Sequence, residues 1–281
     1  MRGKENMAEV SPLDINFLSE FFKKNSGFRI RQAHIATVAN HLEPVIKHHN
    51  FSNLSDLIQR LQRSPSPDLI QQCLEAVAVH ETMFFRDNKP FHHLIDFAIP
   101  EIVAAKRARG EKTIRIWSAA CSSGQEPYSI AMILEDNKNK LHGINYEIVA
   151  TDLSGPILER AKLAVYSQFE VLRGISSHLQ ENYFDPYHGN KWRVKEHLRK
   201  HVSFRKMNLF NIPQDIGKFD IIFCRNVLIY FDRDEKNCVI DSLHSHHNNP
   251  GYLYVGNADI LEKRGLYETT TQSHGIYTKK D

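Results

Sequence analysis

Hydrophobic positions recur every three or four residues across the first part of the chain. They stand at Ile15, Leu18, Phe21 and Phe22, and again at Ile35, Val38, Ala39, Leu42, Val45 and Ile46. Such steps place side chains on one face of a helix. The loop 64–67 (Ser-Pro-Ser-Pro) precedes another helix start at Pro67-Asp68, and no strand-like run occurs before about residue 113. Residues 12–80 therefore predict a small all-α domain.

Beyond residue 113 the pattern changes to short β-rich runs that alternate with helical segments. We expect strands at 113–117, 146–151, 219–224 and 252–255, and helices at 128–134, 157–163 and 237–245. The run 219–224 is almost wholly apolar, as expected of a strand that is covered on both sheet faces. The alternation predicts a doubly wound, Rossmann-like α/β domain at about 90–281. Residues 166–205 interrupt it and predict a small antiparallel β insertion.

Composition excludes several classes of protein. The 281 residues carry 36 basic and 33 acidic side chains, a net charge of +3, which argues against a nucleic-acid partner. The four cysteines form no CxxC pair, and the histidines at 244, 246 and 247 read best as a solvated helix end, so we expect no metal site. The first 14 residues lack an apolar region, and no run of about 18 apolar residues exists. We therefore expect a cytoplasmic protein without a membrane span.

Four segments carry candidate chemistry. The small-residue loop at 117–128 follows a predicted strand and opens a helix, where open α/β sheets bind ligands. Asp152 directly follows the next strand and suits the two hydroxyls of a ribose. The structural alternatives are an ordinary connecting loop at 117–128 and a helix N-cap at Asp152, shared with Ser154.

The other two segments lie at 223–232 and 80–87. Arg225 and Asn226 follow the apolar strand, with Tyr230 close by, and suit a charged substrate beside a cofactor. A structural ion pair of Arg225 and a core position for Tyr230 are the alternatives. Thr82 and Arg86 are four residues apart, so they share a face if their segment is helical. The alternative there is a helix with a solvated arginine.

Together these segments resemble the CheR family of chemotaxis receptor methyltransferases. The matching stretches are ETMFFRD, RIWSAACSSGQEPYSIAM, ATDLS, NLF and FDIIFCRNVLIYFD, in the family's order and spacing, over about residues 65–280. The resemblance implies a methyl transfer from S-adenosylmethionine to glutamate side chains of a methyl-accepting chemoreceptor. It also implies an N-terminal helical domain, in agreement with the hydrophobic pattern.

The resemblance also implies roles for individual residues. Arg86, Arg225 and Tyr230 would lie in the reaction zone, Glu126 would bind the cofactor's methionine amine, and Asp152 would hold its ribose. The implied cofactor-binding set is His80, Thr82, Arg86, Ala119, Glu126, Asp152, Asn208, Leu209, Arg225 and Asn226. The chain departs from the family at His80, where asparagine is frequent, and at Gly256-Asn257-Ala258-Asp259, where a GHSE-like run is usual.

Two further departures concern the partner. The family's N-terminal domain carries a basic helix, but here Arg29, Arg31, Lys47, Arg60 and Arg63 are interrupted by Glu43 and histidines. The turn at 185–191 is short compared with members that grip a receptor's C-terminal peptide, so we expect no tight tether. A cofactor-binding regulatory or scaffold protein without turnover is the alternative function, and a nucleic-acid methyltransferase is disfavoured by the charge balance.

Because a glutamate has a reference pKa of about 4.3, it is already an anion at neutral pH. Methyl transfer to it needs no general base, which is consistent with the lack of a Ser/His or His/Asp constellation. We expect an in-line displacement in which the enzyme mainly positions and partly desolvates the reactants.

Overall fold

The computed structural model describes residues 11–30, 34–259, 261, 265–270 and 274–280. Arg31 of the predicted basic set and the first ten residues, on which the expected lack of a secretion leader partly rests, lie outside this range. The chain divides into two units, residues 1–79 with 230–235, and residues 80–229 with 236–281. No helix in the described ranges is long and apolar enough to cross a membrane.

The first unit is helical, as the hydrophobic spacing predicts. Its helices are α1 (Pro12–Ser26), α2 (Ile35–His48), α3 (Leu54–Arg63) and α4 (Pro67–Val77). Ser11 and Asp14 form a capping box at the start of α1, and Ser66 caps α4 ahead of Pro67. The side chains of Leu18, Phe22 and Leu42 are fully buried, so the predicted faces form the core of this unit.

The second unit alternates strands and helices. Its first elements are α5 (Lys89–His93), the π-helical turn Leu94–Ala98, α6 (Ile99–Ala108), β1 (Thr113–Ala119), α7 (Gln125–Asp136), the 3-10 turn Lys138–Leu141, β2 (Asn145–Asp152) and α8 (Gly155–Leu163). They are followed by β3 (Val165–Ser167), α9 (Gln168–Leu172), α10 (Ser177–Tyr183), β4 (Phe184–Tyr187), β5 (Lys191–Val194), α11 (Glu196–Arg199), β6 (Val202–Lys206), the 3-10 turn Gln214–Ile216, β7 (Phe219–Cys224), β8 (His247–Val255), β9 (Tyr267–Thr269) and β10 (Ile276–Lys279). Between β7 and β8, the 3-10 turn Leu228–Tyr230 and α12 (Arg233–Ser245) each belong partly to the first unit, which includes residues 230–235.

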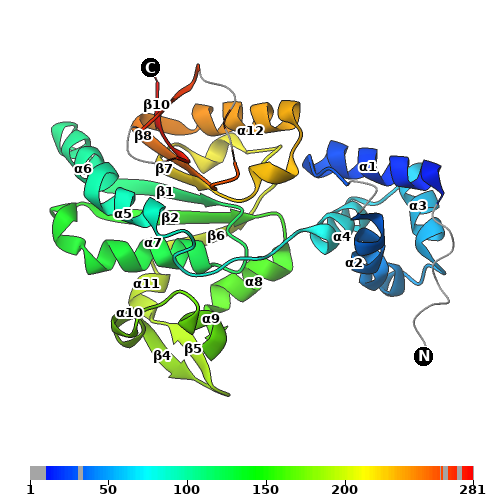
Figure 1. Ribbon diagram of the computed structural model, residues 1–281, viewed down its shortest axis with the longest axis horizontal. Coiled ribbons are helices and arrows are strands. Elements are labelled where there is room, and N and C mark those ends of the chain that lie inside the picture. Colours follow the sequence, from blue (N-terminus) through cyan, green and yellow to red (C-terminus); the bar gives the residue numbers. More distant parts are fainter. Residues whose placement is uncertain (1–10, 31–33, 260, 262–264, 271–273, 281) are drawn as a thin grey trace. The chain divides into compact units, whose positions relative to one another are not determined.

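A seven-stranded sheet forms the centre of this unit, in the order β6-β2-β1-β7-β8-β10-β9. The strands from β6 to β8 are parallel to their neighbours, and β10 and β9 are added antiparallel at one edge. All six residues of β7 are buried, because helices lie on both sides of the sheet in Figure 1. The predicted doubly wound α/β fold is thus confirmed.

The sheet order reverses direction between β1 and β7. From β1 the chain adds β2 and β6 on one side, whereas β7 and β8 lie on the other. The carboxyl ends of neighbouring strands diverge at such a switch point, where open α/β sheets bind their ligands. This arrangement brings the residues that follow β1, β2, β6, β7 and β8 to one rim.

A small antiparallel sheet, β3-β5-β4, interrupts the larger one, near α9 and α10 in Figure 1. Tyr166, Phe184 and Val194 on its inner face are buried in the core of the unit. The predicted insertion reaches to about residue 205, but β6 at its end pairs with β2 in the large sheet. The insertion therefore ends before Val202, because β6 is a strand of the main sheet and pairs with β2 over its whole length.

Candidate functional site

The loop between β1 and α7 is a tight turn of backbone at the rim. Ala120, Ser122 and Gly124 all have positive φ, of 58°, 51° and 92°. A Cβ on Gly124 would also stand 3.0 Å from the Tyr166 hydroxyl and 3.1 Å from Ala161, so glycine is required here. Ala119 ends β1 and is buried beneath this turn. The loop is therefore shaped by specific backbone geometry rather than being an ordinary connection.

Asp152, the last residue of β2, holds this loop in place. Its Oδ2 accepts a hydrogen bond from the Ser122 backbone at 2.8 Å, and its Oδ1 accepts one from the Ser154 backbone at 3.0 Å. The N-cap of α8 is Ser154, so the alternative role of Asp152 as the cap residue is not the arrangement found. A carboxylate offers about four acceptor positions. The Leu153 N–H is a third donor to this carboxylate, so Asp152 retains acceptor capacity for at least one hydroxyl of a ligand.

Burial raises the pKa of Asp152, while the N–H groups of Ser154 and Ser122 and the charge of His80 oppose the rise. The backbone carbonyl of His80 accepts a hydrogen bond from the Ser122 hydroxyl at 2.9 Å. His80 and Asp152 are thus joined through the same loop residue, as the resemblance implies for two members of one site.

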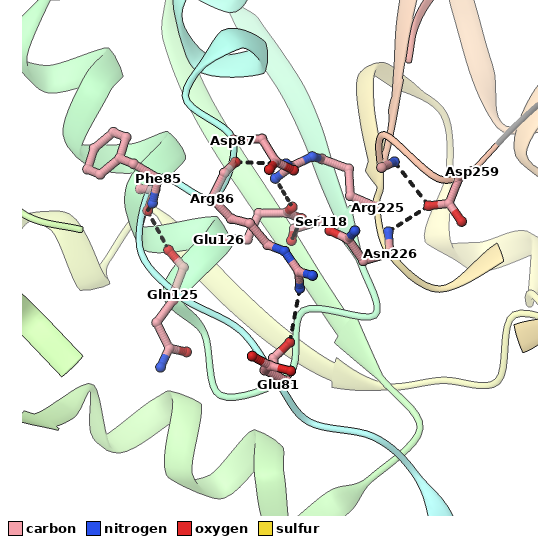
Figure 2. Close-up of polar contacts among 12 residues, drawn as sticks. Glu81, Phe85, Arg86, Asp87, Ser118, Gln125, Glu126, Arg225, Asn226 and Asp259 are labelled. Atoms are coloured by element: carbon pink, nitrogen blue, oxygen red, sulfur yellow. Dashed lines mark hydrogen bonds and ion pairs between the residues drawn. The ribbon is translucent and has the colours of Figure 1, made fainter. Parts of the chain in front are cut away.

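Arg225 is the centre of the polar contacts at the end of β7 (Figure 2). Its Nη1 donates to Glu126 at 3.2 Å, and its Nη2 donates to the Arg86 carbonyl at 2.7 Å and to Asp87 at 2.8 Å. The side chain is only 2% exposed. The structural ion pair considered for Arg225 is therefore present, and it links β7 to two segments distant in sequence.

Glu126 lies in the first turn of α7, and its carboxyl group is 13% exposed. Its Oε1 accepts a hydrogen bond from the Ser118 hydroxyl at 2.7 Å, and its Oε2 faces Arg225. Burial raises the pKa of Glu126, and the charges of Arg225 and Arg86 and the Ser118 hydroxyl counteract part of that rise. An anion held in this way attracts a cationic ligand strongly because few waters screen it.

The segment 80–88 is not helical, so Thr82 and Arg86 do not share a helix face. Three of its non-glycine residues, Phe85, Asp87 and Asn88, have positive φ. The Phe85 N–H donates to Ser129 at 2.9 Å, and Arg225 holds the next two residues. Backbone in this region is strained and persists only where surrounding contacts enforce it.

The remaining predicted residues fall at defined places. Asn208 and Leu209 follow β6, whose last residue is in register with Asp152. Asn226 follows Arg225 with a positive φ of 59°. Tyr230 belongs to the first unit, where its ring stacks on Phe28 at 5.2 Å. Its predicted place near the transferred methyl stays a prediction.

Three contributors were missed by the sequence analysis: Ser118, Asp87 and Asp259. Ser118 and Asp87 lie inside the motifs that carry the resemblance, but nothing local in the sequence connects them with Glu126 or Arg225. Asp259 accepts backbone hydrogen bonds from Asn226 and Gly256, at 2.7 and 3.0 Å. The sequence marked its position only as a departure from the family.

The rim offers the groups that a sulfonium nucleoside with an amino-acid tail requires. Asp152 suits ribose hydroxyls, Glu126 suits an ammonium group, and the Nε of Arg225 is buried without a hydrogen-bond partner among the described residues. The described residues contain no cluster of three or more histidine, cysteine or acidic side chains that could hold a metal ion. The two carboxylates and the guanidinium at the rim therefore fit the polar groups of S-adenosylmethionine.

Comparison with known proteins agrees with this assignment. Residues 80–276 match the family model of the "CheR methyltransferase, SAM binding domain", and residues 13–78 match that of the "CheR methyltransferase, all-alpha domain". The chain is 37% identical to "Chemotaxis protein methyltransferase Cher2" of Pseudomonas putida over 94% of its length and 96% of the relative's. It is 36% identical to "Chemotaxis protein methyltransferase 1" of Pseudomonas aeruginosa, covering 88% of this chain and 90% of that protein. The chain therefore belongs to the CheR methyltransferase family, and its cofactor is S-adenosylmethionine.

Proposed function

We propose that the chain transfers a methyl group from S-adenosylmethionine to glutamate side chains in the cytoplasmic part of a methyl-accepting chemoreceptor. The observation that carries this proposal is the pair of acids at the rim, the buried Asp152 and the mostly buried Glu126, with the guanidinium of Arg225 beside Glu126. The names of the relatives support the same substrate class. The reaction corresponds to a protein-glutamate O-methyltransferase of the cytoplasm.

The roles of the two arginines differ in this proposal. Arg225 is occupied by Glu126, Asp87 and the Arg86 carbonyl, so it acts by fixing the segment that carries Arg86. Arg86 is half-buried and donates to one carbonyl, that of Glu81, at 3.2 Å among the described contacts. We assign the substrate carboxylate to Arg86.

The reaction neutralises charge, and this limits how strongly the enzyme should bind the carboxylate. The bound cofactor supplies a methyl group on a sulfonium, and the glutamate supplies the attacking oxygen. An arginine that gripped the anion tightly would stabilise the ground state more than the transition state. A single, partly solvated Arg86 meets this requirement better than the buried Arg225 would.

A methyl-transfer assay tests the proposal. Purified chain is incubated with a chemoreceptor cytoplasmic fragment and cofactor labelled in its methyl group. Label should enter the receptor as a base-labile ester, and a fragment with its acceptor glutamates changed to alanine should remain unlabelled. Binding of S-adenosylhomocysteine without any label transfer would favour the regulatory alternative and overturn the proposal.

A further inference from the structure

The loops after β7 and β8 are joined by one buried carboxylate, that of Asp259. Asp259 is only 2% exposed. Its Oδ2 accepts the backbone N–H of Asn226 at 2.7 Å and that of Gly256 at 3.0 Å (Figure 2). Because Cys224 and Val255 are paired at the ends of β7 and β8, both N–H groups lie at the same rim.

The geometry around this carboxylate leaves little freedom. A Cβ on Gly256 would stand 2.7 Å from the Asn226 side-chain nitrogen and 2.8 Å from its backbone nitrogen. The two loops therefore approach each other so closely that glycine is needed at 256. Asn226 itself has a φ of 59°, a left-handed conformation that asparagine adopts more readily than other non-glycine residues and that the surrounding contacts stabilise further.

The Asp259 carboxylate supplies that enforcement. Burial raises its pKa, and the N–H groups of Asn226, Gly256 and Ile229 oppose the rise, so backbone donors from both loops support the charged form. A buried carboxylate with such donors forms strong, short hydrogen bonds. The peptide that these bonds fix joins Arg225 to Asn226, two residues of the predicted cofactor site.

We propose that Asp259 is a positioning residue for the cofactor, which acts by locking the Arg225-Asn226 turn in its left-handed conformation. This inference rests on the cofactor site of the proposed function and assigns a role to the position where the chain departs from the GHSE-like run. The backbone N–H groups of Asn226 and Gly256 both meet Oδ2 of Asp259, so a side chain whose oxygen accepts both bonds should preserve binding.

Three variants test the inference by calorimetric titration with S-adenosylhomocysteine. Asp259→Ala should weaken binding about 10- to 100-fold, because two backbone donors lose their acceptor. Asp259→Asn should stay within about fivefold of the wild type, since its amide oxygen accepts both N–H groups. Gly256→Ala, whose Cβ would displace Asn226 and would also stand 2.8 Å from Oδ2 of Asp259, should weaken binding by about tenfold or more.

Asp215→Ala serves as the matched control, because Asp215 is exposed and pairs only with the exposed Arg205 in the described structure. It should leave binding unchanged. Wild-type affinity in Asp259→Ala or in Gly256→Ala would overturn the inference, as would an Asp259→Asn variant as weak as the alanine variant. If Asp259→Ala does not fold, the affinities of Asp259→Asn and Gly256→Ala still test the inference. Lack of binding by the wild type would contradict the cofactor site itself, which separates the two failures.

Discussion

Asp152 has two tasks that a simple deletion cannot separate. Its oxygens accept backbone N–H groups of Ser122 and Ser154, and we expect them to accept ribose hydroxyls as well. Asp152→Ala should therefore weaken cofactor binding both by loosening the loop and by removing the ribose contact. Changing the ligand instead of the protein isolates the second effect.

We predict that removal of both ribose hydroxyls from S-adenosylhomocysteine weakens its binding to the wild type about 10- to 100-fold, as expected for hydrogen bonds to a charged acceptor. The same change of ligand should weaken binding to Asp152→Asn by a clearly smaller factor. Calorimetric titration of both proteins with both ligands gives the coupling free energy between the Asp152 carboxylate and the ribose hydroxyls. Equal losses in the two proteins would show that the ribose lies elsewhere.

Glu126 makes cofactor binding depend on pH in a defined direction. Burial raises its pKa in the free protein, and a bound ammonium group favours its charged form. Affinity for S-adenosylhomocysteine should therefore fall as the pH falls through this raised pKa, at a higher pH than an ordinary glutamate would titrate. Glu126→Gln should bind about 10-fold or more weakly at neutral pH and lose much of this dependence.

Titration at several pH values between about 5 and 8 measures this effect, with the reference pKa of glutamate as the comparison. Asp152 also has a raised pKa, so some pH dependence should remain in Glu126→Gln. An unchanged profile in that variant would rule out Glu126 as the group that meets the ammonium.

Among the elements, the segment 80–88 depends most on a distant partner. Arg225 bridges Glu126, Asp87 and the Arg86 carbonyl with two of its nitrogens, and an ammonium group cannot reproduce this planar fork. Arg225→Lys should therefore reduce kcat about 10-fold or more, and lower the free energy of unfolding by about 1–3 kcal/mol. Arg205→Lys, at the exposed pair with Asp215, is the control and should change neither. Full activity in Arg225→Lys would contradict the assigned role.

The elements also show what the sequence could predict. The strand expected at 219–224 coincides with β7, because its apolar run reflects burial on both faces. The short strands β6, β9 and β10 escaped prediction because they span only three to five residues, each with one buried position at its start and no alternation of buried and exposed residues. Asp152 was singled out from its place after a strand, and Glu126 through the family resemblance; their cofactor contacts stay predictions. The partners of Arg225 were not identified, since Asp87 lies 138 residues away and only the folded rim brings them together.

At the scale of the whole molecule, the partner's mode of binding remains a prediction. The turn between β4 and β5 comprises only three residues, His188, Gly189 and Asn190, with the last two at positive φ. In the described sheet β4 is an edge strand, and Pro186 within it lacks an N–H for pairing with another strand. Both features disfavour the addition of a receptor tail as an extra strand.

We therefore predict that a peptide with the sequence of a receptor's C-terminal tail gives no saturable heat in a calorimetric titration up to about 100 µM, where a dissociation constant near 1 µM would be evident. The full cytoplasmic fragment should still be methylated, and removal of its tail should leave kcat/KM within about twofold, because the loss of a tether matters only when the tether binds. Tight peptide binding would mean that the short turn and Pro186 do not close the β4 edge. The receptor would then be recruited through the insertion, and the fragment without its tail should be methylated more slowly in proportion to the lost local concentration.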